Sequence, residues 1–258
     1  KAFRSKAALL AASPAFSAES GTTYQQAADY AAQVLDAIGG ISGMDPTGWT
    51  WYANNSEIDG LSNGANPKEV MWRGEKASNN DWETDNYPPS LYGKGRINPT
   101  QNFVDAFPAA NGYPITDPRS DYDPSDPYSN RDPRLTAYVV VDGGAVGVNN
   151  TVINTEKGSG KDGINNEVGS STRTGYYLRK LLRQDINLDP KVNSKQFHYT
   201  PRIRYTEIFL NYAEAANEAF GPKGTGTHAY SAYDVIKAIR HRAGMTDDSY
   251  LDGCAESK

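Results

Sequence analysis

EIFLNYAEAANEAF, residues 207–220, carries two side-by-side patterns of helical spacing. The polar positions are Glu207, Asn211, Glu214 and Glu218, and the apolar positions beside them are Ile208, Tyr212, Ala215 and Ala219. Each set repeats every three or four residues, which places it along one face of an α-helix. The segment is therefore predicted to be a helix that buries most of its surface against neighbouring helices.

The glutamates of this polar stripe allow two interpretations. Paired carboxylates serve as acid and base in hydrolases, but a glycosidase pair normally comes from separate elements about 5–10 Å apart. Arginines lie nearby in the sequence, at Arg202, Arg204, Arg240 and Arg242. Because an unpaired buried charge is costly, we expect the stripe to pair with these arginines or with backbone donors. We therefore assign it a structural role and predict no catalytic residue.

Capping residues and apolar spacing predict four helices, at residues 2–12, 23–38, 201–219 and 229–243. Thr200 is the expected N-cap of the third, and the pair Thr23 and Gln26 forms a capping box for the second. The last two helices form a hairpin with small residues at their contact, as in tetratricopeptide-type arrays. The predicted fold class is mainly α, a helix-hairpin scaffold.

The region between the helices has a different composition, rich in Gly, Asn, Asp and Pro, and contains all four tryptophans. It predicts a loop-rich lobe with a small β-hairpin, formed by LTAYVVV (135–141) and GVNNTVINT (147–155). The expected organisation is scaffold helices at 1–40, the lobe at 41–199, the helix hairpin at 200–245 and a tail at 246–258.

Composition excludes several classes of function. The net charge is -5 with no long basic run, so nucleic acid is not an expected partner. The single Cys254 excludes a disulfide framework, and with only three histidines we expect no metal and no cofactor. No apolar run approaches the roughly 20 residues that span a bilayer.

One stretch of the lobe, WRGEKASNNDWETDNY (72–87), is suited to sugars. Sugars present apolar C–H faces ringed by hydroxyls, and they bind to aromatic faces flanked by amides, carboxylates and guanidinium groups. The alternative is that these aromatic residues anchor a long loop to the body of the protein. The predicted ligand-binding residues are Arg73, Asn80, Asp81, Trp82 and Tyr87.

Several ordered segments together resemble the SusD/RagB family. They are KAALLAASPAF (6–16), NPTQNFVDAFPAANGYPI (98–115), NRDPRL (130–135), TGYYLRK (174–180), RYTEIFLNYAEAANEAFG (204–221) and AYDVIKAIRHRAGM (232–245). The resemblance implies a SusD-like α-α superhelix with an irregular lobe that carries the ligand site. It also implies a non-catalytic, lipid-anchored protein of the outer-membrane surface that binds glycan. The implied partner is a TonB-dependent (SusC-like) transporter, to which the oligosaccharide or polysaccharide is delivered.

The resemblance covers the central portion of the family pattern, so we expect this chain to be a piece without the usual N- and C-terminal parts. The lipid anchor would lie in the missing N-terminal part, because Cys254 is near the other end. Two rival functions remain: an all-α glycoside hydrolase or lyase, suggested by the many carboxylates, and a peptide-binding helical-repeat scaffold, suggested by the helix hairpins.

Overall fold

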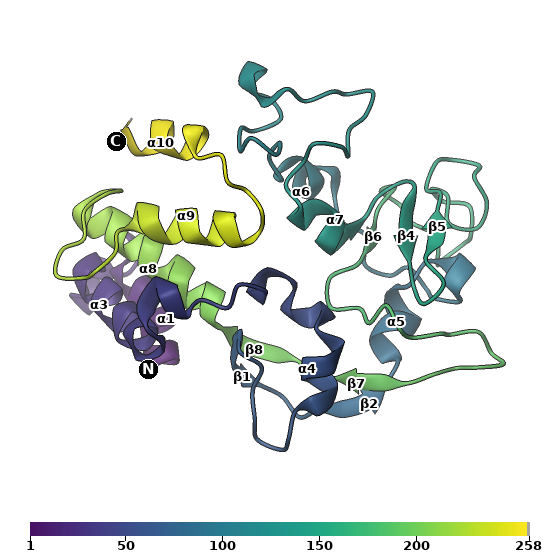
Figure 1. The fold of residues 1–258 in the computed structure, drawn as a ribbon, viewed down its shortest axis with the longest axis horizontal. Helices are drawn as coiled ribbons and strands as arrows, with labels where there is room; N and C mark the ends of the chain where they lie inside the picture. Colours follow the sequence, from purple (N-terminus) through teal and green to yellow (C-terminus); the bar gives the residue numbers. More distant parts are fainter. Residues whose placement is uncertain (257–258) are drawn as a thin grey trace. The chain divides into compact units, whose positions relative to one another are not determined.

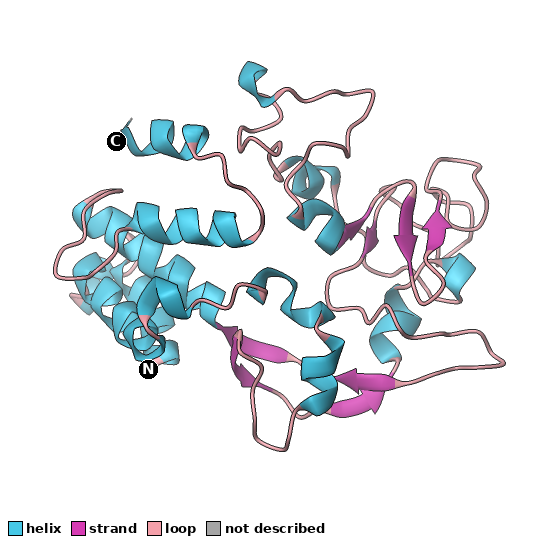
Figure 2. Cartoon of the chain, in the orientation of Figure 1, coloured by secondary structure: helices cyan, strands magenta, loops and turns pink. Residues whose placement is uncertain are grey.

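The computed structural model describes residues 1–256, which form two compact units. The helical unit comprises Lys1–Trp49, Asn66–Gly74 and the chain from Pro201 onward, and the lobe unit comprises Thr50–Ala65 and Glu75–Thr200. Figure 2 shows that helices dominate the first and that the strands occur as short pairs. None of the helices in the described part of the chain is long and apolar enough to cross a membrane.

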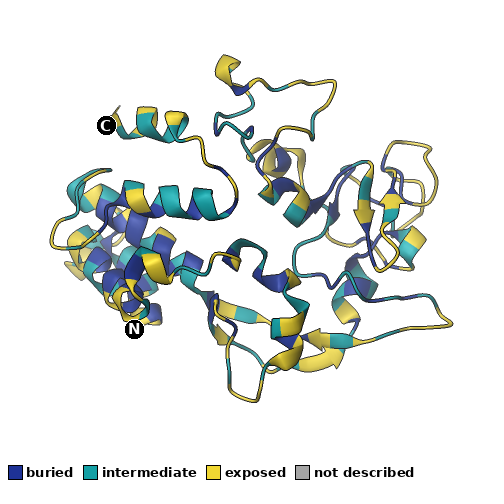
Figure 3. Ribbon diagram, viewed as in Figure 1, coloured by how far each residue is buried: buried dark blue, intermediate teal, exposed yellow. Residues whose placement is uncertain are grey.

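The helical unit is built from α1 (Ala2–Ala12), α3 (Tyr24–Leu35), α8 (Tyr205–Phe220) and α9 (Ala232–Arg242), which lie side by side in Figure 1. Alanines dominate the buried faces of α1 and α3 and form part of that of α8, so these helices approach closely. Figure 3 shows the buried residues along their inner sides. The short α2 (Ser17–Ser20) follows α1, and α10 (Ser249–Glu256) follows α9.

The four predicted helices are present, and the capping box of α3 is confirmed. The Gln26 amide donates to Thr23 Oγ1 at 3.2 Å, and the Thr23 amide donates to Gln26 Oε1 at 3.0 Å. Short 3-10 turns connect the elements, at η1 (Asp36–Ile38), η2 (Gly40–Gly43), η3 (Gly48–Ala53), η4 (Pro89–Leu91) and η5 (Pro118–Ser120).

The start of the third predicted helix is wrong. Residues Pro201–Arg204 form strand β8, which pairs antiparallel with β1 (Val70–Arg73), and the helix begins only at Tyr205. Ile203 is buried while its neighbours in the strand are less so, and proline is tolerated at the first residue of a strand. The distant partner strand, which local sequence cannot reveal, outweighs the helix-start signal.

The predicted arginine pairs of the polar stripe of α8 are wrong. Glu207 pairs with Lys6 of α1 at 2.6 Å, while Glu214 and Glu218 are exposed to solvent. Water therefore solvates most of this stripe, and the helix is less enclosed than its apolar stripes indicated.

The buried carboxylate of Glu69, just before β1, forms ion pairs with two arginines of the helical unit. Glu69, 1% exposed, lies 3.4 Å from Arg204 Nη1 and 3.3 Å from Arg242 Nη1. It also accepts hydrogen bonds from the Thr206 amide at 3.1 Å and from the Thr206 hydroxyl. This network joins β1 to the first turn of α8 and to the end of α9.

The lobe unit contains α4 (Asn55–Gly60), α5 (Asp81–Asn86), α6 (Gln101–Asp105) and α7 (Arg134–Tyr138). Its three strand pairs are β2 (Ala77–Asn79) with β7 (Gln196–His198), β3 (Val139–Val140) with β6 (Tyr177–Leu178), and β4 (Gly144–Val146) with β5 (Thr151–Ile153). One hydrophobic cluster of this unit surrounds Tyr87, Tyr177 and Leu182, and another surrounds Leu135 and Tyr176.

A hairpin is present in the lobe, but its predicted strands are partly wrong. The hairpin pairs β4 with β5, both of which lie after the turn at Asp142 and Gly143. Most of the predicted strand 135–141 is helix α7, and only its end forms β3, whose partner is the distant β6. Short apolar runs do not distinguish a buried helical turn from a strand.

Removing the Glu69 carboxylate should strongly destabilise the helical unit. We expect Glu69→Ala to lower the free energy of unfolding by about 3–5 kcal/mol, because it leaves two partly buried guanidinium groups without their shared partner. Denaturant titration followed by circular dichroism measures this. The matched control is Glu207→Ala, which breaks an exposed pair and should cost at most about 1 kcal/mol. Equal losses in the two variants would contradict the role assigned to Glu69.

Candidate functional site

A pocket of about 270 Å³ opens on the lobe unit between α5 and the chain that returns alongside it. It is lined by Asp81, Trp82, Asp85, Asn86, Arg96 and Ile97. The lining thus combines an indole, two carboxylates, an amide and a guanidinium group in one small space.

Helix α5 supplies four of these side chains because of its periodicity. Asp81 and Asp85 are four residues apart, as are Trp82 and Asn86, so the two pairs share one side of the helix. Glu83 lies on the other side and is completely buried. The short helix therefore presents one face to the pocket and inserts the other into the unit.

The returning segment is held against α5 by backbone hydrogen bonds. The Lys94 amide donates to Thr84 O at 3.0 Å, and the Arg96 amide donates to Asp85 O at 2.9 Å. The turn that allows this needs Gly93, because a Cβ there would lie 2.1 Å from Tyr87 O. These bonds place Arg96 and Ile97 at the pocket even though both lie well beyond Asn86, the last residue of α5.

Three polar side chains of the pocket, those of Asp85, Asn86 and Arg96, have partners that hold them in place. Asp85 pairs with Arg96 at 3.2 Å and with Lys94 at 3.4 Å. Asn86, 3% exposed, donates from Nδ2 to Trp82 O at 2.9 Å, while its Oδ1 has no hydrogen-bond partner among residues 1–256. A buried acceptor without a partner is unusual, but this oxygen is too enclosed to face the pocket.

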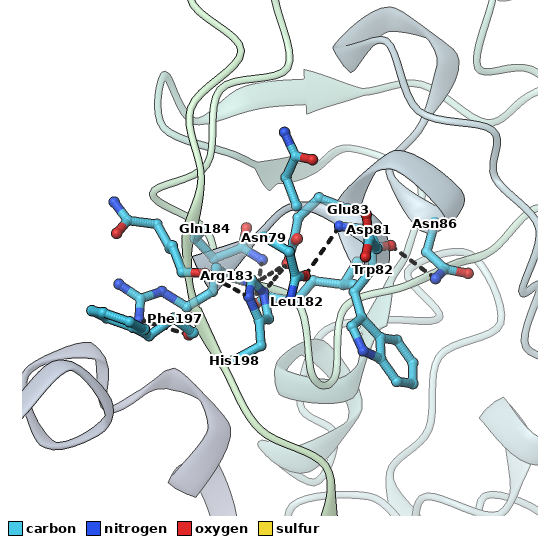
Figure 4. Close-up of polar contacts among 12 residues, drawn as sticks. Asn79, Asp81, Trp82, Glu83, Asn86, Leu182, Arg183, Gln184, Phe197 and His198 are labelled. Atoms are coloured by element: carbon cyan, nitrogen blue, oxygen red, sulfur yellow. Dashed lines mark hydrogen bonds and ion pairs between the residues drawn. The ribbon is translucent and has the colours of Figure 1, made fainter. Parts of the chain in front are cut away.

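Glu83 fixes α5 from behind the pocket. Its Oε1 accepts a hydrogen bond from the Arg183 amide at 2.8 Å and lies 3.0 Å from His198 Nε2. Figure 4 shows Glu83 directed toward His198 and Arg183 while the Trp82 indole projects away from them. Strand β7, which carries His198, is thereby connected to the helix that carries the pocket residues.

Both ring nitrogens of His198 face oxygen atoms. Nδ1 lies 2.9 Å from Gln196 O, and Nε2 faces the Glu83 carboxylate. A neutral imidazole donates from only one nitrogen, so this arrangement is best satisfied by the imidazolium form. Burial lowers the pKa of His198, but the hydrogen bond and charge of Glu83 outweigh it, and the pKa is raised above its usual value of 6.5.

Arg183 and two aspartates complete the charges around this pair. The Arg183 side chain is buried and binds Asp59 at 2.8 Å and Asp185 at 2.6 Å. The hydrogen bond from Arg183 lowers the pKa of Asp185. Because Arg183 is already neutralised by two carboxylates, it opposes the protonation of His198 only weakly.

A profile of the SusD family matches residues 51–252, which is most of the chain. The chain belongs to the SusD family. This is a family of binding proteins without catalytic activity, so the expectation of a non-enzyme holds. A search of curated proteins found no significant match.

Solved structures support the same fold. A SusD-like protein from Bacteroides fragilis superposes with a TM-score of 0.65 at 22% sequence identity, over 94% of this chain and 46% of that one. A SusD-like carbohydrate binding protein from the same species gives a TM-score of 0.59 at 19% identity, over 97% of this chain and 50% of that one. The predicted SusD-like helical fold is confirmed, and the chain spans about half the length of these structures.

The structure brings only two of the five predicted ligand residues to the pocket of this SusD-family chain, Asp81 and Trp82. Asn80 is buried and donates to Asn193 Oδ1 at 2.9 Å and to Ser194 O at 3.0 Å, which fixes the start of α5. Tyr87 is 1% exposed and its hydroxyl donates to Arg183 O, so its ring has no free face for stacking. Arg73 lies in the helical unit, at the end of β1, and is not among the lining residues.

Sequence reasoning missed four lining residues, for two reasons. Asp85 and Asn86 repeat the positions of Asp81 and Trp82 one turn later, so this signal was present once DWETDN is recognised as a helix. Arg96 and Ile97 carry no such signal, because only the turn through Gly93 brings them beside α5.

The His198–Glu83 pair makes stability depend on pH in a defined direction. Because folding raises the pKa of His198, its stabilisation is fully present below about pH 6.5 and is lost as pH rises through the higher folded-state value. We expect His198→Gln to lower the free energy of unfolding by about 1.5–3 kcal/mol at pH 6 and by less at pH 8.5. Urea titrations at both pH values measure this, and an equal loss at the two would contradict an ionic pair.

Proposed function

We propose that the protein binds an oligosaccharide or polysaccharide through the α5 pocket, as part of nutrient uptake. The observation that carries this proposal is the Trp82 indole standing among fixed polar side chains in an open pocket. It is supported by membership of the SusD family and by the carbohydrate-binding description of a structural relative from Bacteroides fragilis.

Each part of the pocket has a role in this proposal. The indole face packs on the apolar C–H face of a sugar ring, and the carboxylates of Asp81 and Asp85 accept hydrogen bonds from hydroxyls. Arg96, which lines the pocket, donates to ring or hydroxyl oxygens of the sugar. Because Glu83 and Gly93 hold both walls in place, little ordering is required when ligand binds.

We infer that the whole protein is lipid-anchored at the surface of the outer membrane and passes its glycan to a TonB-dependent, SusC-like transporter. The support is membership of the SusD family. Co-purification from detergent-solubilised membranes tests this, and recovery of the native protein only as a free periplasmic monomer would refute it.

The rival functions can be separated from this proposal by simple assays. Asp81 and Asp85 are two carboxylates in one pocket, which is the feature that a glycoside hydrolase would use, but Asp85 is engaged by two cations. Release of reducing ends from a polysaccharide panel, abolished by Asp81→Asn, would favour the hydrolase. Silence on a glycan array combined with capture of peptides would favour the peptide-binding scaffold.

Trp82→Ala is expected to weaken binding of the glycan identified on a glycan array by roughly 1–3 kcal/mol, about 5- to 150-fold, because the stacking face is removed. Isothermal titration calorimetry with wild type and variant measures the change. Thermal unfolding of both proteins shows how much of it comes from the partial packing of Trp82 on the core.

The matched control is Tyr87→Phe, which keeps the buried ring and removes only the hydroxyl bonded to Arg183 O. We expect it to lower stability and to leave affinity per folded molecule unchanged. Equal affinity in wild type and Trp82→Ala would show that the α5 pocket is not the site.

A further inference from the structure

A second hollow of about 170 Å³ lies on the same unit, next to the α5 pocket along the chain. Asn86 lines the first pocket and the adjacent Tyr87 lines the second. The second hollow is also lined by Tyr92, Asn149, Asn187 and Asp189. It therefore offers an aromatic ring together with amide and carboxylate groups.

Tyr92 in this hollow has an unusual backbone. It caps the 3-10 turn Pro89–Leu91 in the left-handed conformation, with φ 64 and ψ 18. Glycine or asparagine normally takes this position, since a Cβ is unfavourable there. The conformation is imposed by the turn, in which the Tyr92 amide donates to Pro89 O at 3.0 Å and Gly93 passes close to Tyr87.

The fold gains little from the tyrosine ring at this position. Tyr92 is 57% exposed, and no hydrogen bond, ion pair or ring contact of its side chain occurs within the described residues. A bulky residue is thus held in a conformation that suits glycine or asparagine, while its ring stays mostly in solvent. An outlier of this kind that packing does not explain suggests a functional side chain.

Polar side chains near the ring are available to a ligand. Asn187 Oδ1 accepts from the Asp189 amide at 2.9 Å, which orients the Asn187 amide group and leaves its Nδ2 without a partner among residues 1–256. Asp189 Oδ1 accepts from the Lys191 amide at 2.9 Å. Asn149, on the turn of the β4–β5 hairpin, lies at the same hollow and is exposed.

We propose that this hollow is a second carbohydrate contact, in which Tyr92 stacks on a sugar ring and Asn149, Asn187 and Asp189 bind its hydroxyls. The inference rests on the proposed function of the α5 pocket and extends it to a ligand class, glycan chains long enough to reach both positions. Two contacts on one compact unit act together on a long chain, because binding at the first raises the effective concentration at the second. A disaccharide occupies only one of them.

The experiment compares short and long probes from the same polysaccharide. Titration calorimetry compares five polysaccharides, each beside its own disaccharide. The pairs are pullulan and maltose, arabinoxylan and xylobiose, galactomannan and mannobiose, laminarin and laminaribiose, and dextran and isomaltose. The variant is Tyr92→Asn, because asparagine tolerates the left-handed backbone. The matched control is Phe103→Ala, which removes an aromatic ring of the same unit that is 48% exposed and lies outside both hollows.

We expect Tyr92→Asn to bind the recognised polysaccharide roughly 5- to 10-fold more weakly and the disaccharide as wild type does. Its melting temperature should stay the same or rise, since the unfavourable backbone position is relieved. Phe103→Ala should bind both probes as wild type does.

Two other outcomes separate the inferences. If wild type binds a polysaccharide and Trp82→Ala weakens it while Tyr92→Asn does not, the second contact is refuted and the α5 pocket stands. A glycan found only on the glycan array takes the place of the five polysaccharides, beside its own disaccharide. If neither the array nor the five polysaccharides show binding, the proposed function fails and the second contact fails with it.

Discussion

The buried Glu83 carboxylate is the interaction on which the candidate site depends. Its Oε1 holds the backbone of Arg183 and the ring of His198, so three segments that are far apart in sequence meet at one oxygen atom. A buried charge of this kind is stable only when donors surround it. The two contacts of Oε1 fix the rotation of α5, although Oε2 is buried without a hydrogen-bond partner among residues 1–256. That rotation decides that Trp82 and Asp85 face the pocket.

In the helical unit, Glu69 is likewise a buried carboxylate that binds donors from several segments. Its carboxylate gathers Arg204, Thr206 and Arg242, which come from a strand and two helices. In both units a single buried glutamate connects elements that hydrophobic packing alone would leave free to shift. Such networks add specificity because only one arrangement of the segments satisfies every donor.

Ligand binding is assigned to the exposed side of the segments that these networks and a tight turn position. The turn through Gly93 brings Arg96 beside α5 and at the same time forces Tyr92 into its unfavourable backbone conformation. Both hollows thus depend on one local geometry, the turn that follows the buried Tyr87. Fixed segments that carry exposed aromatic side chains suit a long ligand with repeated apolar faces and hydroxyl groups, such as a glycan chain.

The sequence by itself determined most of each main helix, the helix cap at Thr23, the loop-rich lobe and the resemblance to the family. The helices, the cap and the lobe follow from spacing, capping and composition, which act within a few residues along the chain, whereas the family came from the resemblance of several ordered motifs. Only the tertiary structure decided that Tyr87 and Asn80 are buried, that residues 201–204 are a strand, and that Arg96 reaches the pocket. The reason is that burial and strand pairing depend on distant partners, such as Arg183, Asn193 and β1, whose positions no local pattern encodes.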